Sequence, residues 1–124
     1  GVLVDRTDEF AAASDVVGDF GFLTPTNDRD VQVADLNGDG WPDVVTAVYS
    51  LQVGAPKPIT HPRVYINLGV DGLGNWLGLR DEDSRIPKLH EPADPLFYSV
   101  SVGDLTGDGA PELFFTDGDG WNPP

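Results

Sequence analysis

Short apolar runs alternate with polar stretches rich in Gly and Pro along most of the 124-residue chain. Apolar residues that recur with a period of two, and runs of β-branched and aromatic residues, are typical of strands. The pattern predicts a short helical turn near 10–13, and turns or loops at 69–74, 81–95 and 117–122. It predicts strands at 2–5, 30–33, 44–49, 63–68, 75–79 (the weakest), 98–102 and 113–116. The fold class that follows is all-β.

The chain also contains an internal repeat, because residues 29–47 align with residues 98–116 without a gap. Val31 and Val33 then match Val100 and Val102, and Gly-Asp-Gly at 38–40 matches Gly-Asp-Gly at 107–109. Both copies read as a strand, an acidic loop and a second strand. A recurring unit of this kind predicts an architecture built from similar sheets.

The acidic loops at 35–43 and 104–112 carry the sharpest chemical signal in the sequence. Each has oxygen-bearing side chains at its first, third, fifth and ninth positions and Gly at the sixth. A hard cation such as Ca²⁺ needs several oxygen atoms converging on one point, and the backbone must turn sharply to supply them. The side chains concerned are Asp35, Asn37, Asp39 and Asp43 in the first loop, and Asp104, Thr106, Asp108 and Glu112 in the second.

Composition narrows the classes of partner. The chain has 21 Asp and Glu against 7 Lys and Arg, a formal net charge of −14 at pH 7, which disfavours binding to nucleic acid or to an anionic membrane. It has no Cys, so it holds neither a disulfide nor a thiolate metal site. No apolar run is long enough to cross a membrane, so we expect no membrane insertion. The start at Gly1, without Met or a signal-like segment, predicts a mature, trimmed or excised segment.

The pattern of strand, Asp-x-Asn/Thr-Gly-Asp-Gly-x-Pro-Asp/Glu and strand resembles the FG-GAP/VCBS repeat family, the calcium-loop blades of integrin-α-like β-propellers. Residues 31–45 carry the closest match, residues 63–69 look like a third blade strand ending in Asn, and residues 4–7 resemble an outer-strand ending. The resemblance implies β-propeller blades, about one complete four-stranded blade plus parts of two neighbours, with calcium loops between the first two strands. The units would be the end of a preceding blade and connector at 1–29, a complete blade at 30–97 and the first half of a following blade at 98–124.

By the same resemblance, the first loop would bind Ca²⁺ through the side chains of Asp35, Asn37, Asp39 and Asp43 and the backbone carbonyl of Trp41. The second would use Asp104, Thr106, Asp108, Ala110 and Glu112 in the same way. Thr106 and Glu112 depart from the family pattern, so we expect weaker occupancy there. Gly40 is expected to have a positive φ.

Two other interpretations of the loops stay open. The first is an EF-hand calcium loop, which begins with the same residues. An EF-hand needs a carboxylate at its twelfth position to complete the calcium coordination, but that position is Thr46 in the first loop and Phe115 in the second. The segments on either side of the loops also read as strands, where an EF-hand has helices. A plain Asp/Asn/Gly turn without metal is the second alternative.

No catalytic constellation is evident, so we expect a protein that is not an enzyme. The only histidines, His61 and His90, have no evident nucleophile partner, and most of the prominent carboxylates belong to the loops. Trp41, Trp76 and Trp121 are expected to serve in packing, although exposed tryptophans can also stack on sugars.

The leading hypothesis is an extracellular or cell-surface propeller segment, because millimolar calcium outside cells would fill loops of modest affinity. Its partner would be a protein or glycan ligand, or neighbouring copies of itself. One alternative is a structural subunit that assembles through its incomplete blades into a fibre or ring, and another is the accessory domain of a secreted hydrolase. A closed propeller takes typically 4–8 blades, more than this chain supplies. The chain would therefore be a piece of a larger propeller, a propeller that is only partly traced, or a protomer whose sheets are completed by neighbouring copies.

Overall fold

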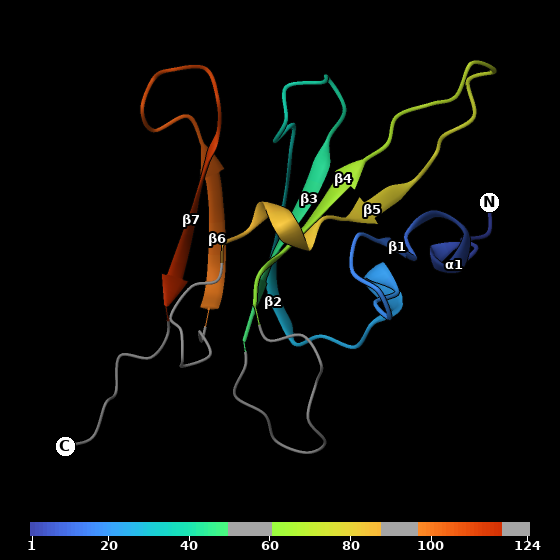
Figure 1. The fold of residues 1–124 in the computed structure, drawn as a ribbon, viewed down its shortest axis with the longest axis horizontal. Helices are drawn as coiled ribbons and strands as arrows, with labels where there is room; N and C mark the ends of the chain where they lie inside the picture. Colours follow the sequence, from blue (N-terminus) through green and yellow to red (C-terminus); the bar gives the residue numbers. More distant parts are fainter. Residues whose placement is uncertain (50–60, 88–96, 118–124) are drawn as a thin grey trace.

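The computed structural model describes residues 1–49, 61–87 and 97–117 (Figure 1). Its elements, in chain order, are α1 (Thr7–Phe10), β1 (Ala13–Ser14), the 3-10 turn η1 (Gly21–Leu23), β2 (Asp28–Ala34), β3 (Asp43–Val48), β4 (Arg63–Asn67), β5 (Leu79–Asp81), the 3-10 turn η2 (Asp83–Arg85), β6 (Phe97–Gly103) and β7 (Glu112–Asp117). Strands dominate, with one four-residue α-helix, so the predicted all-β fold is confirmed. Among the described residues, none forms a helix long and apolar enough to span a membrane.

The larger sheet has five strands in the order β1-β5-β4-β3-β2. Strands β2 to β5 form an antiparallel meander, and the two-residue β1 adds to β5 in parallel. The central strands β3 and β4 are almost entirely buried, and their sequences consist largely of Val, Ile, Tyr and Thr. Such residues fit a pleated surface that is covered on both faces.

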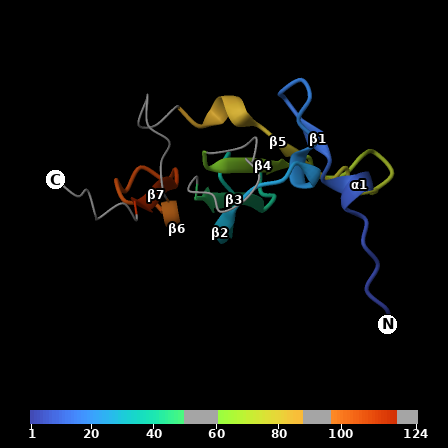
Figure 2. The ribbon, with the colours of Figure 1, turned by 90° about the horizontal axis from the view of Figure 1, so that it is seen from below.

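The smaller sheet is the antiparallel hairpin β6–β7, which packs against one face of the larger sheet (Figure 2). The core lies between the two sheets. Asp30 at the edge strand β2 accepts a hydrogen bond from the backbone N–H of Val100 at 3.1 Å, which ties the sheets together. The buried core residues are Val45, Ala47, Val64, Ile66, Phe97 and Val100, with Leu36, Ile86, Val102, Leu113 and Phe115 packed around them.

The segment that contains η1 covers the opposite face of the larger sheet at β4. The ring of Phe22 stacks on Tyr65 with ring centroids 3.8 Å apart. Arg63, which is 1% exposed, lies 2.6 Å from Asp81 and 2.7 Å from Asp19. Burial on its own lowers the pKa of Arg63, but the hydrogen bonds to Asp81 and Asp19 outweigh it and raise the pKa above its ordinary value. This buried ion network anchors the N-terminal segment to the sheet.

Several predicted boundaries are wrong. Residues 2–5 form no strand, since Val2, Leu3 and Val4 are exposed with no surface to pack on, and Asp5 instead accepts hydrogen bonds from Thr7 at the start of α1. The weak strand at 75–79 lies at 79–81, because Asp71 and Asn75 close a longer turn before it.

Two further boundaries differ from the sequence prediction. The helical turn at 10–13 lies earlier, in α1, and the predicted loop at 81–95 contains the end of β5 and η2. The proposed hairpin turn at 117–122 falls mostly outside the described residues, as do His90 and Trp121. The division into units at 29/30 and 97/98 stays a prediction.

Candidate metal loops

The loop between β2 and β3 is organised around the side chain of Asp35. Its carboxylate accepts hydrogen bonds from the backbone N–H groups of Gly38 and Gly40 at 2.8 Å and of Asp39 at 3.2 Å. Gly40 has a φ of 89°, as expected, a conformation that other residues rarely adopt. One carboxylate thus bends the backbone into a tight loop by binding three successive donors.

The loop between β6 and β7 repeats this arrangement. Asp104 accepts hydrogen bonds from the N–H groups of Gly107 at 2.7 Å, Asp108 at 3.1 Å and Gly109 at 2.8 Å. The fifth position also behaves alike in both loops, since Asp39 accepts the N–H of Trp41 at 2.8 Å and Asp108 accepts that of Ala110 at 2.9 Å. The internal repeat seen in the sequence therefore extends to individual hydrogen bonds.

The third position differs between the loops. The side-chain amide of Asn37 donates to Asp39 at 2.9 Å and accepts the N–H of Asp39 at 3.1 Å. The hydroxyl of Thr106 instead donates to Glu112 at 3.1 Å. Both side chains bring an uncharged oxygen to the loop, but Asn37 contacts the fifth position and Thr106 the ninth.

The ninth position shows the clearest difference. Asp43 is fully buried, and its two oxygens accept the N–H groups of Leu36 and Asn67, both at 2.8 Å. Glu112 is partly exposed and accepts the N–H of Leu105 and, at 3.2 Å, that of Thr106. Asp43 therefore joins the loop to strand β4, whereas Glu112 closes only its own loop.

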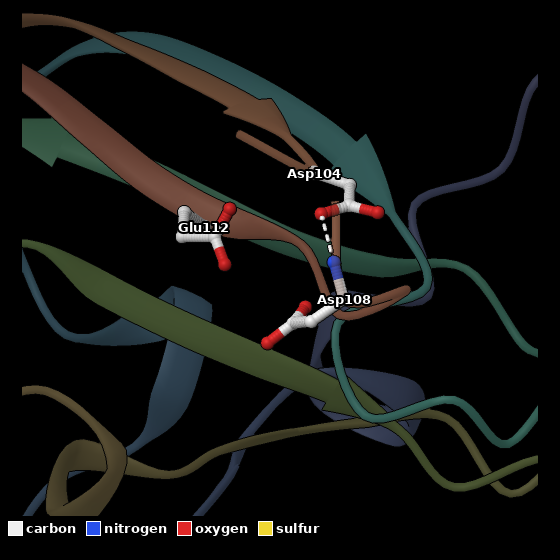
Figure 3. A group of neighbouring side chains, drawn as sticks. All are labelled: Asp104, Asp108 and Glu112. Carbon is white, nitrogen blue, oxygen red and sulfur yellow. Dashed lines mark hydrogen bonds between the residues drawn. The ribbon is translucent and has the colours of Figure 1, made fainter. Parts of the chain in front are cut away.

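In the second loop, the carboxylates converge. One oxygen from each of Asp104, Asp108 and Glu112 lies within 4.8 Å of the others, and Figure 3 shows the three side chains turned toward a common space. Among the described residues, the corresponding acids of the first loop, Asp35, Asp39 and Asp43, do not form such a group, because Asp43 is turned into the sheet.

The donor set fits a hard divalent cation. Both loops offer carboxylate, amide or hydroxyl oxygens, which are ligands that Ca²⁺ prefers. In the described part of the chain, no Lys or Arg forms an ion pair with the loop carboxylates, so a bound cation would be their counter-charge. Each carboxylate oxygen that accepts one N–H has lone-pair capacity left. The backbone carbonyls of Trp41 and Ala110 stay predicted ligands.

Asn67, at the end of β4, is a residue that the sequence reasoning did not connect to the first loop. Besides its N–H bond to Asp43, its side-chain amide donates to the carbonyl of Pro42 at 3.0 Å. Its side-chain oxygen accepts the N–H of Gly69 at 3.0 Å and the indole N–H of Trp76 at 2.8 Å. An Asn followed closely by Gly at the end of a strand was the available signal.

Comparison with known proteins places these loops in a family. The family model of the FG-GAP repeat matches residues 29–56. Integrin alpha-6 of Gallus gallus is 34% identical over 91 residues, which cover 68% of this chain and 7% of the integrin. The chain thus corresponds to a small part of that relative's length. No solved structure gives a significant match. The chain therefore carries an FG-GAP repeat of the integrin-alpha-like family, and its two sheets fit partial blades of a β-propeller.

Proposed function

We propose that this β-propeller segment is stabilised by calcium and belongs to an extracellular or cell-surface protein, in which it presents a binding surface for a protein or glycan. Its role is non-catalytic, in keeping with the FG-GAP family in general. Likeness to an integrin alpha chain supports protein–protein interaction as the broad class of function. The calcium and the binding role are the parts that experiment must test.

The observation that carries the proposal is the shared hydrogen-bond frame of the two loops. In each, an Asp at the first position fixes three backbone N–H groups, and a carboxylate at the ninth position fixes the N–H of the second. In the second loop, this frame holds one oxygen from each of Asp104, Asp108 and Glu112 within 4.8 Å of the others. Like charges at such separations repel, so a divalent cation would stabilise the folded loop and couple binding to folding.

Exposed apolar residues support a larger propeller. On the edge strand β2, Val31 and Val33 lie on the face away from the core and are exposed, and on β7 Phe114 is exposed in the same way. Neighbouring blades of a propeller pack face to face and cover such positions. These residues are therefore suited to contact adjacent blades, while the loops at the hairpin ends are left at one rim.

Thermal unfolding with and without calcium tests the calcium proposal. We expect calcium, but much less so magnesium, to raise the melting temperature of the metal-stripped chain, because Mg²⁺ demands a more rigid octahedral shell. Asp35→Asn and Asp104→Asn would each reduce the response. Asp71→Asn is a matched control, since Asp71 also fixes two backbone N–H groups in an exposed turn, those of Leu73 and Asn75, but lies outside both loops. An unchanged melting temperature in calcium would remove the calcium proposal.

A further inference from the structure

We infer that a pocket at the N-terminal end of the larger sheet binds the ring of a neutral sugar, with Trp76 as its floor. The inference deepens the proposed function, since it rests on a glycan being among the partners and assigns that partner a site. The pocket has a volume of about 700 Å³ and is lined by Arg6, Glu9, Phe10, Gly74, Asn75 and Trp76. A volume of this size is within the usual range for small-molecule sites.

The pocket exists because α1 packs tightly against the connection between β4 and β5 (Figure 2). A Cβ on Gly78 would lie 2.2 Å from the carbonyl oxygen of Phe10, so only glycine permits this approach. The ring of Phe10 consequently stacks on Trp76, with centroids 5.1 Å apart and an interplanar angle of 28°. Two aromatic rings from distant parts of the sequence thus stack on each other at the pocket, and Trp76 keeps 40% of its surface exposed.

The charges at the rim cancel. Arg6 donates two hydrogen bonds to Glu9, at 2.9 and 2.6 Å, and both side chains are more than half exposed. The guanidinium of Arg6 also lies 4.4 Å from the centroid of Phe10, so a cation already occupies that ring face. The net charge of −14 disfavours an anion. A cationic and an anionic ligand are thus both less suited to the pocket than a neutral one.

The remaining chemistry matches a polyhydroxylated ring. The C–H face of a pyranose is apolar and can stack on an aromatic ring, while its hydroxyl groups need donors and acceptors at the edge. Arg6 has N–H groups beyond those given to Glu9, and the Glu9 carboxylate has further acceptor capacity. Asn75 donates through its amide nitrogen to Asp71 at 3.0 Å, which leaves its amide oxygen as an acceptor at the rim.

Trp76 is held in a defined orientation, which favours binding because little freedom is then lost. Its indole N–H donates to Asn67 at 2.8 Å, and Asn67 is in turn bound to Pro42 and Asp43 of the first acidic loop. Asn67 is therefore the positioning residue of the pocket floor.

Saturation-transfer NMR on the full chain in calcium buffer tests the inference, with the methyl pyranosides of glucose, galactose, mannose and N-acetylglucosamine as probes. We expect transfer to at least one probe, weakened by about tenfold or more in Trp76→Ala. Phe114→Ala is the control, because Phe114 is also an exposed aromatic residue, at 59%, but lies on β7 in the other sheet and does not line the pocket. Glu9→Ala, at an exposed position, is the second variant, and we expect it to weaken binding even if Trp76→Ala does not fold.

Two results would overturn the inference: no transfer to any probe at concentrations up to about 50 mM, or equal transfer in the parent chain and Glu9→Ala. Calcium binding is measured by calorimetry on the same samples. Heat on addition of calcium, with no saturation transfer to any sugar probe, would count against the sugar pocket alone. Saturation transfer to a sugar probe, with no heat on addition of calcium, would support the sugar pocket and count against the calcium proposal.

Discussion

The carboxylate of Asp43 accepts the backbone N–H of Asn67 on the neighbouring strand at 2.8 Å, inside the sheet and fully shielded from solvent. Its second oxygen accepts the N–H of Leu36 at the start of the acidic loop. One side chain thus connects the loop, β3 and the end of β4. The ninth loop position has a structural role here whether or not a cation is bound.

Replacing Asp43 with Ala is expected to reduce the free energy of unfolding by about 3 kcal/mol, because the buried N–H of Asn67 and the part-buried N–H of Leu36 lose a charged acceptor. Urea unfolding in the presence of a chelator measures this without any contribution from metal. Glu112→Ala is the matched control at the ninth position of the second loop. Since Glu112 is partly exposed, we expect a loss below about 1 kcal/mol. Equal losses in the two variants would contradict the structural role assigned to Asp43.

The close approach of α1 to Gly78 predicts a second contrast. Gly78→Ala places a methyl group 2.2 Å from the Phe10 carbonyl oxygen at a φ of 89°, and we expect a loss of about 2–3 kcal/mol from strain and lost packing. Gly74→Ala has a similar φ of 83° but open space around the added carbon, so the expected loss is about 1 kcal/mol. Melting curves compare the two. If Gly74→Ala loses as much stability as Gly78→Ala, the positive φ alone determines the loss, and the close contact between Gly78 and Phe10 adds nothing to it.

A third prediction concerns Thr46, whose buried hydroxyl has no hydrogen-bond partner among the described residues. Thr46→Val removes the hydroxyl while keeping the shape, and we expect a gain in stability of about 1 kcal/mol. Thr24→Val provides the opposite case, since the Thr24 hydroxyl accepts the N–H of Phe20 at 2.7 Å and donates to Asp19 at 3.2 Å. That variant is expected to lose about 1–2 kcal/mol. A loss in Thr46→Val would mean that its hydroxyl is satisfied.

The pH dependence of stability is expected to involve Glu82. Burial raises the pKa of Glu82, but its contacts with Arg80 and Arg85 outweigh burial and hold the pKa below its ordinary value of 4.5. The ionised form therefore favours the folded state above about pH 4.5, and that contribution is lost as the pH falls through the lower folded pKa. Urea unfolding between about pH 5 and pH 3 is expected to show a shallower pH dependence in Glu82→Gln than in the parent chain. Identical slopes would contradict this assignment.

The strands around the loops were predictable because their residues are locally consistent. The runs at 30–33, 44–49, 63–68, 98–102 and 113–116 combine β-branched residues with turn signals on either side, and each falls largely within an observed strand. The acidic loops were equally predictable, since Asp35 and Asp104 accept hydrogen bonds from backbone N–H groups only a few residues further along the chain.

The features of the fold that the sequence did not predict depend on contacts between residues far apart in the chain. Nothing near Asp43 in the sequence shows that its carboxylate binds Asn67, 24 residues away. The pairing of Arg63 with Asp19 and Asp81 is likewise a tertiary contact, and it draws the N-terminal segment onto the sheet. Val2, Leu3 and Val4 look like a strand by composition, yet among the described residues they have no strand to pair with. Local pattern cannot supply such partners.

The most direct test of the account is calorimetric titration of the metal-stripped chain with Ca²⁺. We expect two binding events, one abolished by Asp35→Asn and the other by Asp104→Asn, because each of these carboxylates organises its own loop and is a predicted ligand there. If the stripped chain releases or absorbs no heat on addition of calcium, and both variants behave like the parent, the acidic loops are turns held by their own hydrogen bonds and not calcium sites.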